Sequence, residues 1–137
     1  MANAKVILDL TELEHLIKRE PQRVKKIVKA TAFQAQGYMQ DNSAVDTGAQ
    51  KSGIHVKTND YDGGREAIAS VLEANPKAGI ADFPAPTDGY TARVGPVTEY
   101  SIYQEFGTSK MAAHPFVVPG IELARREFET RWRELFI

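Results

Sequence analysis

The sequence contains no cysteine, no long apolar run and no excess of charge of either sign. Without cysteine the chain has no disulfide framework and no thiol chemistry, which fits a reducing compartment. Its 17 basic and 18 acidic residues give a formal net charge of −1, so no overall field would hold DNA or an anionic membrane. The N-terminus has no apolar run of signal-peptide length, and no stretch approaches the ~20 apolar residues of a membrane span. We therefore expect a soluble, intracellular product without a membrane partner.

The length of 137 residues predicts one domain over 1–137. A chain of this size buries roughly two-thirds of the surface that it exposes when unfolded, which is enough for a real core.

The N-terminal third predicts two helices. Thr11 to Glu14 has the pattern of a capping box after a short apolar run at 5–8, and Pro21 suits the first residue of a longer helix to about Gln40. Gly37 inside that helix predicts a close approach by another segment, because glycine there costs ~1 kcal/mol against alanine. The inward face is predicted from helical spacing: Val24, Ile27, Val28, Thr31, Ala35, Tyr38 and Met39.

The middle of the chain predicts three antiparallel strands, at 54–58, 67–72 and 90–94. In the first, Ile54, Val56 and Thr58 alternate with His55 and Lys57, which we expect to face outward. A last helix is predicted from 118 to 135, with its inward side made by Ile121, Ala124, Phe128, Trp132 and Leu135. The predicted class is α+β: a small antiparallel sheet of about three to four strands packed against a long N-terminal helix and a C-terminal helix.

A long loop, at about 73–89, separates the second and third predicted strands. It is rich in proline and glycine, and Ile80 and Phe83 are its only large apolar residues. A loop of this length in a compact domain is typically functional or disordered. We expect it to be mobile in the isolated subunit and Ile80 and Phe83 to face a partner.

Residues 100–119 concentrate apolar anchors, a glycine and two prolines. Tyr100, Tyr103 and Phe106 recur every three residues, which predicts a short helix with one aromatic edge turned inward. Gly107 is predicted to end that helix in the left-handed conformation. Buried side chains are then predicted at Met111, Phe116 and Val117, with Pro115 and Pro119 stiffening the chain between them.

Catalytic and metal-binding patterns are weak. His15, His55 and His114 are dispersed and lack the short spacing of metal ligands. Asp46, His55 and Ser52 are close in sequence, but no GxSxG or similar frame exposes a nucleophile. We therefore predict no enzyme activity, no catalytic, metal or cofactor site, and no small-molecule substrate.

Two motifs stand out in the sequence. The first is a turn in which the Asp46 carboxylate is expected to accept backbone N–H bonds, and the second spans the aromatic helix and the segment after it. Their residues are Val45, Asp46, Thr47 and Gly48, and then Glu105, Phe106, Gly107, Thr108, Met111, Pro115, Phe116 and Pro119. Both motifs resemble those of the HK97 gp10-like tail-component family of tailed bacteriophages.

The resemblance implies a structural virion protein of a phage or prophage, a minor neck or tail component of the head–tail joining or tail completion kind. Its implied partners are copies of itself in a ring, the head connector and tail proteins, and its places are the virion and, during assembly, the host cytoplasm. Since the sequence offers no spare apolar stripe, we expect ring closure to need a template. No sequence-specific nucleic acid is implied. The alternative is a small nucleic-acid-associated or regulatory domain that uses the basic face at 23–29.

Overall fold

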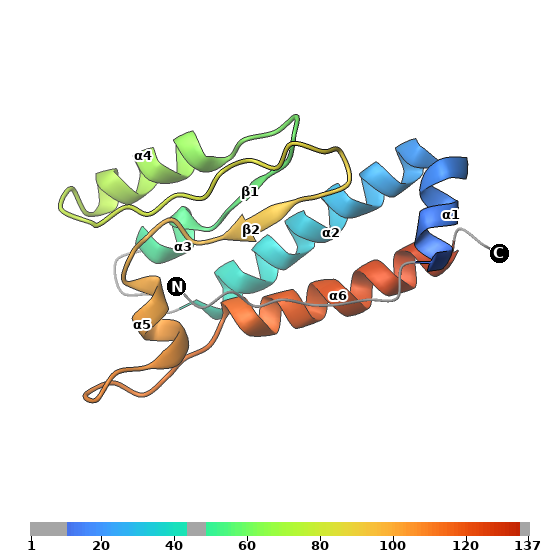
Figure 1. The fold of residues 1–137 in the computed structure, drawn as a ribbon. Coiled ribbons are helices and arrows are strands. Elements are labelled where there is room, and N and C mark those ends of the chain that lie inside the picture. The colour runs from blue at the N-terminus through green and yellow to red at the C-terminus, as the bar shows by residue number, and fades with distance from the viewer. Residues whose placement is uncertain (1–10, 44–48, 135–137) are drawn as a thin grey trace.

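A computed structural model describes residues 11–43 and 49–134 (Figure 1). The predicted features at 5–8, at Val45 to Gly48 and at Leu135 lie outside these residues. The described elements are α1 (Thr11–Arg19), α2 (Pro21–Asn42), α3 (Ala49–Gly53), β1 (His55–Lys57), α4 (Gly64–Ala74), β2 (Arg93–Gly95), α5 (Ser101–Phe106) and α6 (Val117–Arg133).

The two predicted N-terminal helices are confirmed, and they meet at Pro21. Proline stands in the first turn of α2, where its missing N–H removes no intrahelical bond. The Glu20 N–H donates to the Leu16 carbonyl at 2.7 Å, which closes the end of α1. The chain therefore changes direction at Glu20 with little loss of backbone hydrogen bonding.

Helices α2 and α6 run antiparallel and form the spine of the molecule (Figure 1). The close approach between them is at Gly120, not at Gly37. A Cβ added at Gly120 would lie 2.7 Å from Met39 Cγ, whereas one added at Gly37 would meet nothing within 4 Å. The prediction for Gly37 is therefore wrong, because its side of α2 is not covered at that point.

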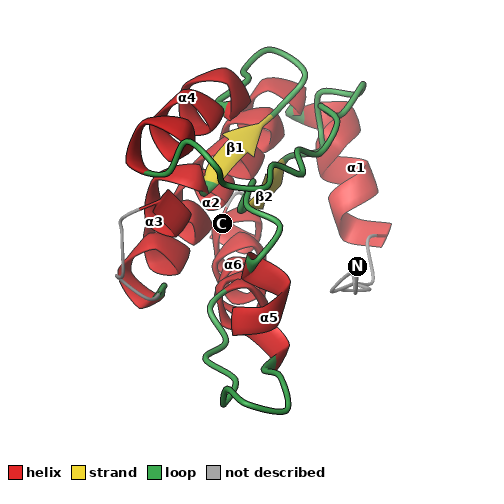
Figure 2. Ribbon diagram, turned by 90° about the vertical axis from the view of Figure 1, so that its left-hand side faces the viewer, coloured by secondary structure: helices red, strands yellow, loops and turns green. Residues whose placement is uncertain are grey.

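The α+β class is confirmed, but among the described residues the sheet has two strands instead of three or four. β1 and β2 pair antiparallel, with Val56 opposite Val94. The pair lies against α2, and α4 covers β1 from the other side (Figures 1 and 2).

The segment predicted as a strand at 67–72 belongs to helix α4. Ala67 and Val71 are its buried residues and lie four positions apart, so they share one helical face. The apolar residues around them also fit a period of two over this short window, which is why the pattern did not separate the two structures. The three alanines and two glutamates of α4 favour the helix.

The predicted facing of β1 is half right. Ile54, Val56 and Thr58 are buried as predicted, but His55 and Lys57 are buried as well, with 2% and 6% of their surface exposed. A strand covered on both faces does not show the alternation of a half-exposed one.

Three apolar clusters make up the core along the spine and the sheet. The first joins Leu16, Val24 and Trp132, the second Ala35, Met39, Ile54 and Phe116, and the third Val71 and Val97. The middle cluster links α2, β1 and the start of α6, so it connects the sheet to the spine.

Phe116 is fully buried in the middle cluster, as predicted. We expect Phe116→Ala to lower the free energy of unfolding by about 3–5 kcal/mol, through lost burial and the cavity left behind. Urea unfolding measures this, and Phe106→Ala is the matched control because Phe106 is half exposed. Equal urea midpoints for the two variants would contradict the assignment of Phe116 to the core.

Candidate assembly surface

Helix α5 with its N-cap residue Tyr100 and the loop after it, residues 100–116, project from the body of the molecule and are here called the arm (Figure 2). Gly107 ends α5 with a φ of 77°, and its N–H donates to the Tyr103 carbonyl at 2.7 Å. A Cβ at this position would lie 2.9 Å from both Ala113 N and Met111 O. The predicted glycine stop is therefore confirmed, and close contact as well as φ requires glycine here.

The Glu105 carboxylate joins the two ends of the arm. Its Oε1 accepts the N–H groups of Phe116 and Val117 at 2.9 and 2.8 Å, and its Oε2 accepts that of Val118 at 2.9 Å. Phe116, the N-cap residue of α6, has no side chain that could accept these bonds. Glu105 is 5% exposed, and it places a negative charge at the positive end of the α6 dipole.

Further hydrogen bonds hold the loop of the arm. The Thr108 N–H donates to the Met111 carbonyl at 2.9 Å, and Thr108 Oγ1 accepts the Lys110 N–H at 3.2 Å. The His114 N–H donates to the Gln104 carbonyl at 2.7 Å, and His114 Nε2 lies 3.1 Å from the Asn42 carbonyl oxygen. The loop is thus tied to α5 and to the end of α2.

The aromatic edge of the arm faces solvent, contrary to the prediction, and Met111, which was predicted to be buried, is exposed as well. Tyr103 is 57%, Phe106 54% and Met111 46% exposed, and Tyr100 is 37% exposed. The buried face of α5 consists instead of Ser101, Gln104 and Glu105. Because the capping of α6 requires Glu105 to point inward, the residues on the other side of this short helix point outward. Tyr100, Tyr103, Phe106 and Met111 are called the arm patch below.

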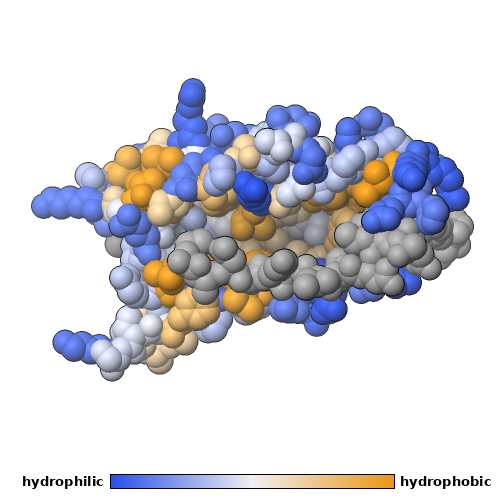
Figure 3. Space-filling view, viewed as in Figure 1, coloured by the Kyte–Doolittle hydropathy of each residue, from blue (hydrophilic) through white to orange (hydrophobic). Residues whose placement is uncertain are grey.

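Apolar surface gathers at the end of the molecule that carries α4, α5 and the start of α6 (Figure 3). Exposed apolar groups clustered on a projecting element are typical of protein–protein contacts, whereas single exposed apolar residues are ordinary. The arm patch is therefore the candidate assembly surface.

The loop predicted at 73–89 is attached to the sheet at its centre. Ile80 forms a bridge with Thr98, and the Ala81 N–H donates to the Val97 carbonyl at 2.7 Å. The Phe83 ring stacks on the His55 ring with 4.5 Å between centroids. Ile80 and Phe83 therefore make contacts within the subunit. The expected mobility of the loop rested on a shortage of such contacts, so it loses that support around these two residues. Their role toward a partner stays a prediction.

A buried polar cluster fixes this loop against β1. Lys57 Nζ lies 2.7 Å from Asp82 Oδ2 and 3.6 Å from Asp62 Oδ1. His55 Nε2 lies 3.1 Å from Asp82 Oδ1, and its Nδ1 lies 2.9 Å from the Gly53 carbonyl oxygen. Burial by itself would raise the pKa of Asp82, but the hydrogen bond from Lys57, the Phe83 N–H and the charge of His55 lower that pKa below its ordinary value.

Metal chemistry has no geometric support in the part of the chain that the structure describes. No three His, Cys, Asp or Glu side chains in it are grouped so as to hold a metal ion. His15, His55 and His114 lie on α1, β1 and the arm, so the fold does not bring the three histidines together. Asp46, the third member of the catalytic set weighed above, lies outside the described residues.

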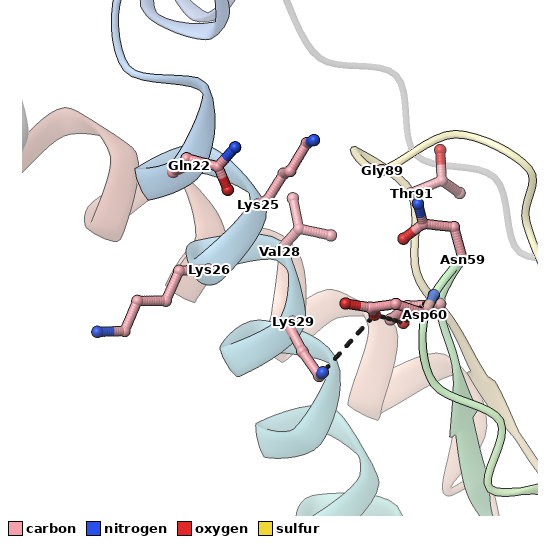
Figure 4. A pocket seen from close by; sticks show the side chains of 10 residues that line it. Gln22, Lys25, Lys26, Val28, Lys29, Asn59, Asp60, Gly89 and Thr91 are labelled. Atoms are coloured by element: carbon pink, nitrogen blue, oxygen red, sulfur yellow. Dashed lines mark hydrogen bonds and ion pairs between the residues drawn. The ribbon is translucent and has the colours of Figure 1, made fainter.

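The basic face at 23–29 borders an open pocket of about 270 Å³ between α2 and the turns that carry Asn59 and Gly89 (Figure 4). Lys29 pairs with Asp60 at 3.7 Å, and Arg23 pairs with Glu20 at 3.7 Å. The Thr58 hydroxyl, followed by Lys29, lowers the pKa of Asp60, so this carboxylate stays ionised beside the lysines. Lys26 points away from the pocket (Figure 4). Acidic partners thus interrupt the face, which weakens the nucleic-acid alternative.

Sequence reasoning missed two features of these surfaces. Glu105 was identified as part of a motif, but its capping role was not. The hydrogen bonds that cap α6 link Glu105 to backbone groups 11 to 13 residues away, and a local sequence pattern does not indicate such a link. Phe33 and Tyr61 form an exposed aromatic pair, with ring centroids 5.3 Å apart. A signal for the pair existed in Phe33, an aromatic residue outside the predicted inward face of α2.

No helix among the described residues has the length and apolar character needed to cross a membrane.

The sequence model of the family described as Bacteriophage HK97-gp10 tail-component matches residues 10–107. The match covers more than half of the chain, from the start of α1 to the glycine that ends α5. The comparison with curated proteins and the comparison with solved structures each found no match.

We expect Glu105→Ala to lower the free energy of unfolding by about 2–3 kcal/mol, because three N–H groups at the start of α6 lose a charged acceptor. Glu105→Gln is the matched variant and should recover part of the loss, since it keeps one acceptor oxygen. Urea unfolding measures both, and amide exchange at Phe116 to Val118 should quicken in the alanine variant. Unchanged exchange there would contradict the capping role.

The lowered pKa of Asp82 predicts how the stability of the fold depends on pH. Its pKa in the folded state lies below the ordinary value of 3.8, so the stability that it contributes is fully present above that value and is lost as pH falls through the lower pKa. We expect Asp82→Asn to cost about 1–3 kcal/mol at neutral pH, and this cost should shrink below about pH 4.

Acid titration of the urea midpoint tests this expectation. In a Lys57→Met background the same substitution should have a smaller effect, because the main partner of Asp82 is gone. A cost of Asp82→Asn that does not change with pH would show that the ionised carboxylate is not what stabilises the loop.

Proposed function

The chain belongs to the HK97-gp10-like family of bacteriophage tail components, and on this premise we propose that it acts in head–tail joining or tail completion as one of several identical subunits of a ring. Membership of the family implies a structural protein of the virion. The finer role is supported above all by the arm, which presents four large apolar side chains to solvent on a projecting element.

The body of the molecule supports a structural role. Its apolar clusters hold α2, α6 and the sheet together without the arm patch, so the fold does not require the arm patch to be buried. A subunit with a complete core and a fixed, exposed arm is suited to repeated contacts with equivalent neighbours.

The proposed partners are copies of this chain, the head connector and the adjacent tail proteins, and the proposed places are the assembled virion and the host cytoplasm during assembly. A structural role is in keeping with the family, and we propose no catalytic activity. The nucleic-acid alternative is tested separately, by salt-dependent retention of the protein on DNA.

Removal of the gene from the phage or prophage that encodes it tests the proposed role. Electron microscopy of the lysate should then show filled heads and tails that are not joined, or tails with incomplete ends. Supplying the protein in trans should restore joined, infectious particles. Normal particles in the absence of the gene would contradict the proposal.

We expect the purified protein to be monomeric or weakly associating at micromolar concentration, because a stable interface needs about 1,000 Å² or more of buried surface. A head connector or tail end would raise the local concentration and allow the ring to close. Light scattering coupled to size exclusion measures the mass. A stable ring at low micromolar concentration without any partner would contradict the need for a template.

A further inference from the structure

We propose that the arm patch of one subunit packs on the Phe33–Tyr61 pair of the next copy of this chain, in a head-to-tail contact. The inference rests on the proposed function, because a repeated assembly is what would bring a second copy to this position. It goes beyond the proposed function by naming the two surfaces of the subunit that meet.

The exposed large apolar side chains of the described residues lie in three places. Four of them, Tyr100, Tyr103, Phe106 and Met111, form the arm patch, and Leu72 lies on α4. Phe33 and Tyr61, 36% and 38% exposed, form the second group. A head-to-tail contact needs two different patches on each subunit, and the described surface presents two.

The Phe33–Tyr61 pair has the chemistry of a contact site. The two rings meet edge to face with an interplanar angle of 66°, so each supports the other and both keep an exposed side. Lys29 Nζ lies 5.5 Å from the centre of the Tyr61 ring and pairs with Asp60. An aromatic centre with a charged rim is typical of protein interfaces.

The two patches lie on different sides of the molecule. The connection between β1 and α4, which carries Tyr61, is at the top of Figures 1 and 2, and the arm is at the bottom of both. A contact between them leaves one free patch on each partner. Such a contact repeats from copy to copy and closes into a ring when the rotation allows, whereas a two-fold dimer would use one patch twice.

Hydrogen bonds hold the arm to the rest of the subunit. The Glu105 carboxylate bonds to the start of α6, and the His114 ring bonds to the end of α2. Binding therefore costs little conformational entropy for the backbone, which favours a small apolar patch as a binding element.

The available area makes the contact weak by itself. An aromatic side chain buries about 150–250 Å² when fully covered, so the half-exposed arm patch offers on the order of 300–400 Å². This is below the roughly 800 Å² per partner of a standard interface. The contact should therefore need high concentration or a template, in keeping with a subunit that is monomeric when dilute.

The absence of cysteine allows a clean cross-linking test. The double variant Phe33→Cys/Phe106→Cys, at submillimolar concentration with a short bis-maleimide, should give a ladder of oligomers on denaturing gels. Each single variant should give dimers at most, because one thiol per chain cannot extend a chain. The matched control is Leu72→Cys/Phe106→Cys, which pairs the arm with an exposed apolar residue of α4. All three substituted side chains are exposed, and circular dichroism checks that the variants fold.

A ladder that is much stronger in the first double variant than in the control is the expected result. Dimers alone, no products, or equal ladders in both double variants would overturn the inference. The same variants in joined particles separate this inference from the proposed function. Subunits that enter particles but cross-link elsewhere contradict only the contact, whereas a ladder from protein that never enters particles contradicts only the role in the tail.

Discussion

The structure depends on one buried carboxylate, that of Glu105, which accepts three N–H groups at the start of α6. This interaction sets where α6 begins and which side of α5 faces inward. Once Glu105 points toward α6, Gln104 and Ser101 share its buried face, and the aromatic residues of α5 are left on the solvent side. A capping interaction thereby determines the composition of an exposed surface.

The same arrangement separates the core from the surface proposed for assembly. Phe116, at the end of the arm, is fully buried with Met39 and Ile54, while Phe106, the last residue of α5, is exposed. Gly107, the only residue among those described with a positive φ, reverses the chain between the two aromatics. The arm is attached at both of its ends, so its apolar groups stay in solvent without loosening the core.

A second polar cluster plays a comparable part at the sheet. Lys57 and His55 are buried beside Asp82, which holds the long loop over the outer face of β1. Charged residues inside a protein are costly unless they are paired. Pairing them with Asp82 covers the second face of the strand, and the short sheet ends up enclosed by α2 on one side and by α4 and the loop on the other.

The sequence by itself determined the elements whose signals are local. Helical spacing located α2 and α6. Pro21 marked the start of α2, and Gly107 marked the end of α5. The two motifs indicated the family. It also placed Phe116 in the core. These predictions hold because residues three or four positions apart, or a backbone angle at one position, already carry the information.

Only the tertiary structure decided which faces are covered. The segment at 67–72 has a short apolar pattern that suits a strand or a helix. Its composition favours the helix, and packing against α3 and β1 decides which face of that helix is buried. His55 and Lys57 alternate with apolar residues like exposed positions, yet an aspartate 25 residues further along buries them. The aromatic edge at 100–106 was assigned to the core for its hydrophobicity, and it faces solvent because Glu105, on the opposite side of the same helix, must reach α6. Each of these outcomes depends on a partner distant in sequence. A local sequence pattern carries no information about which distant residue will lie beside it.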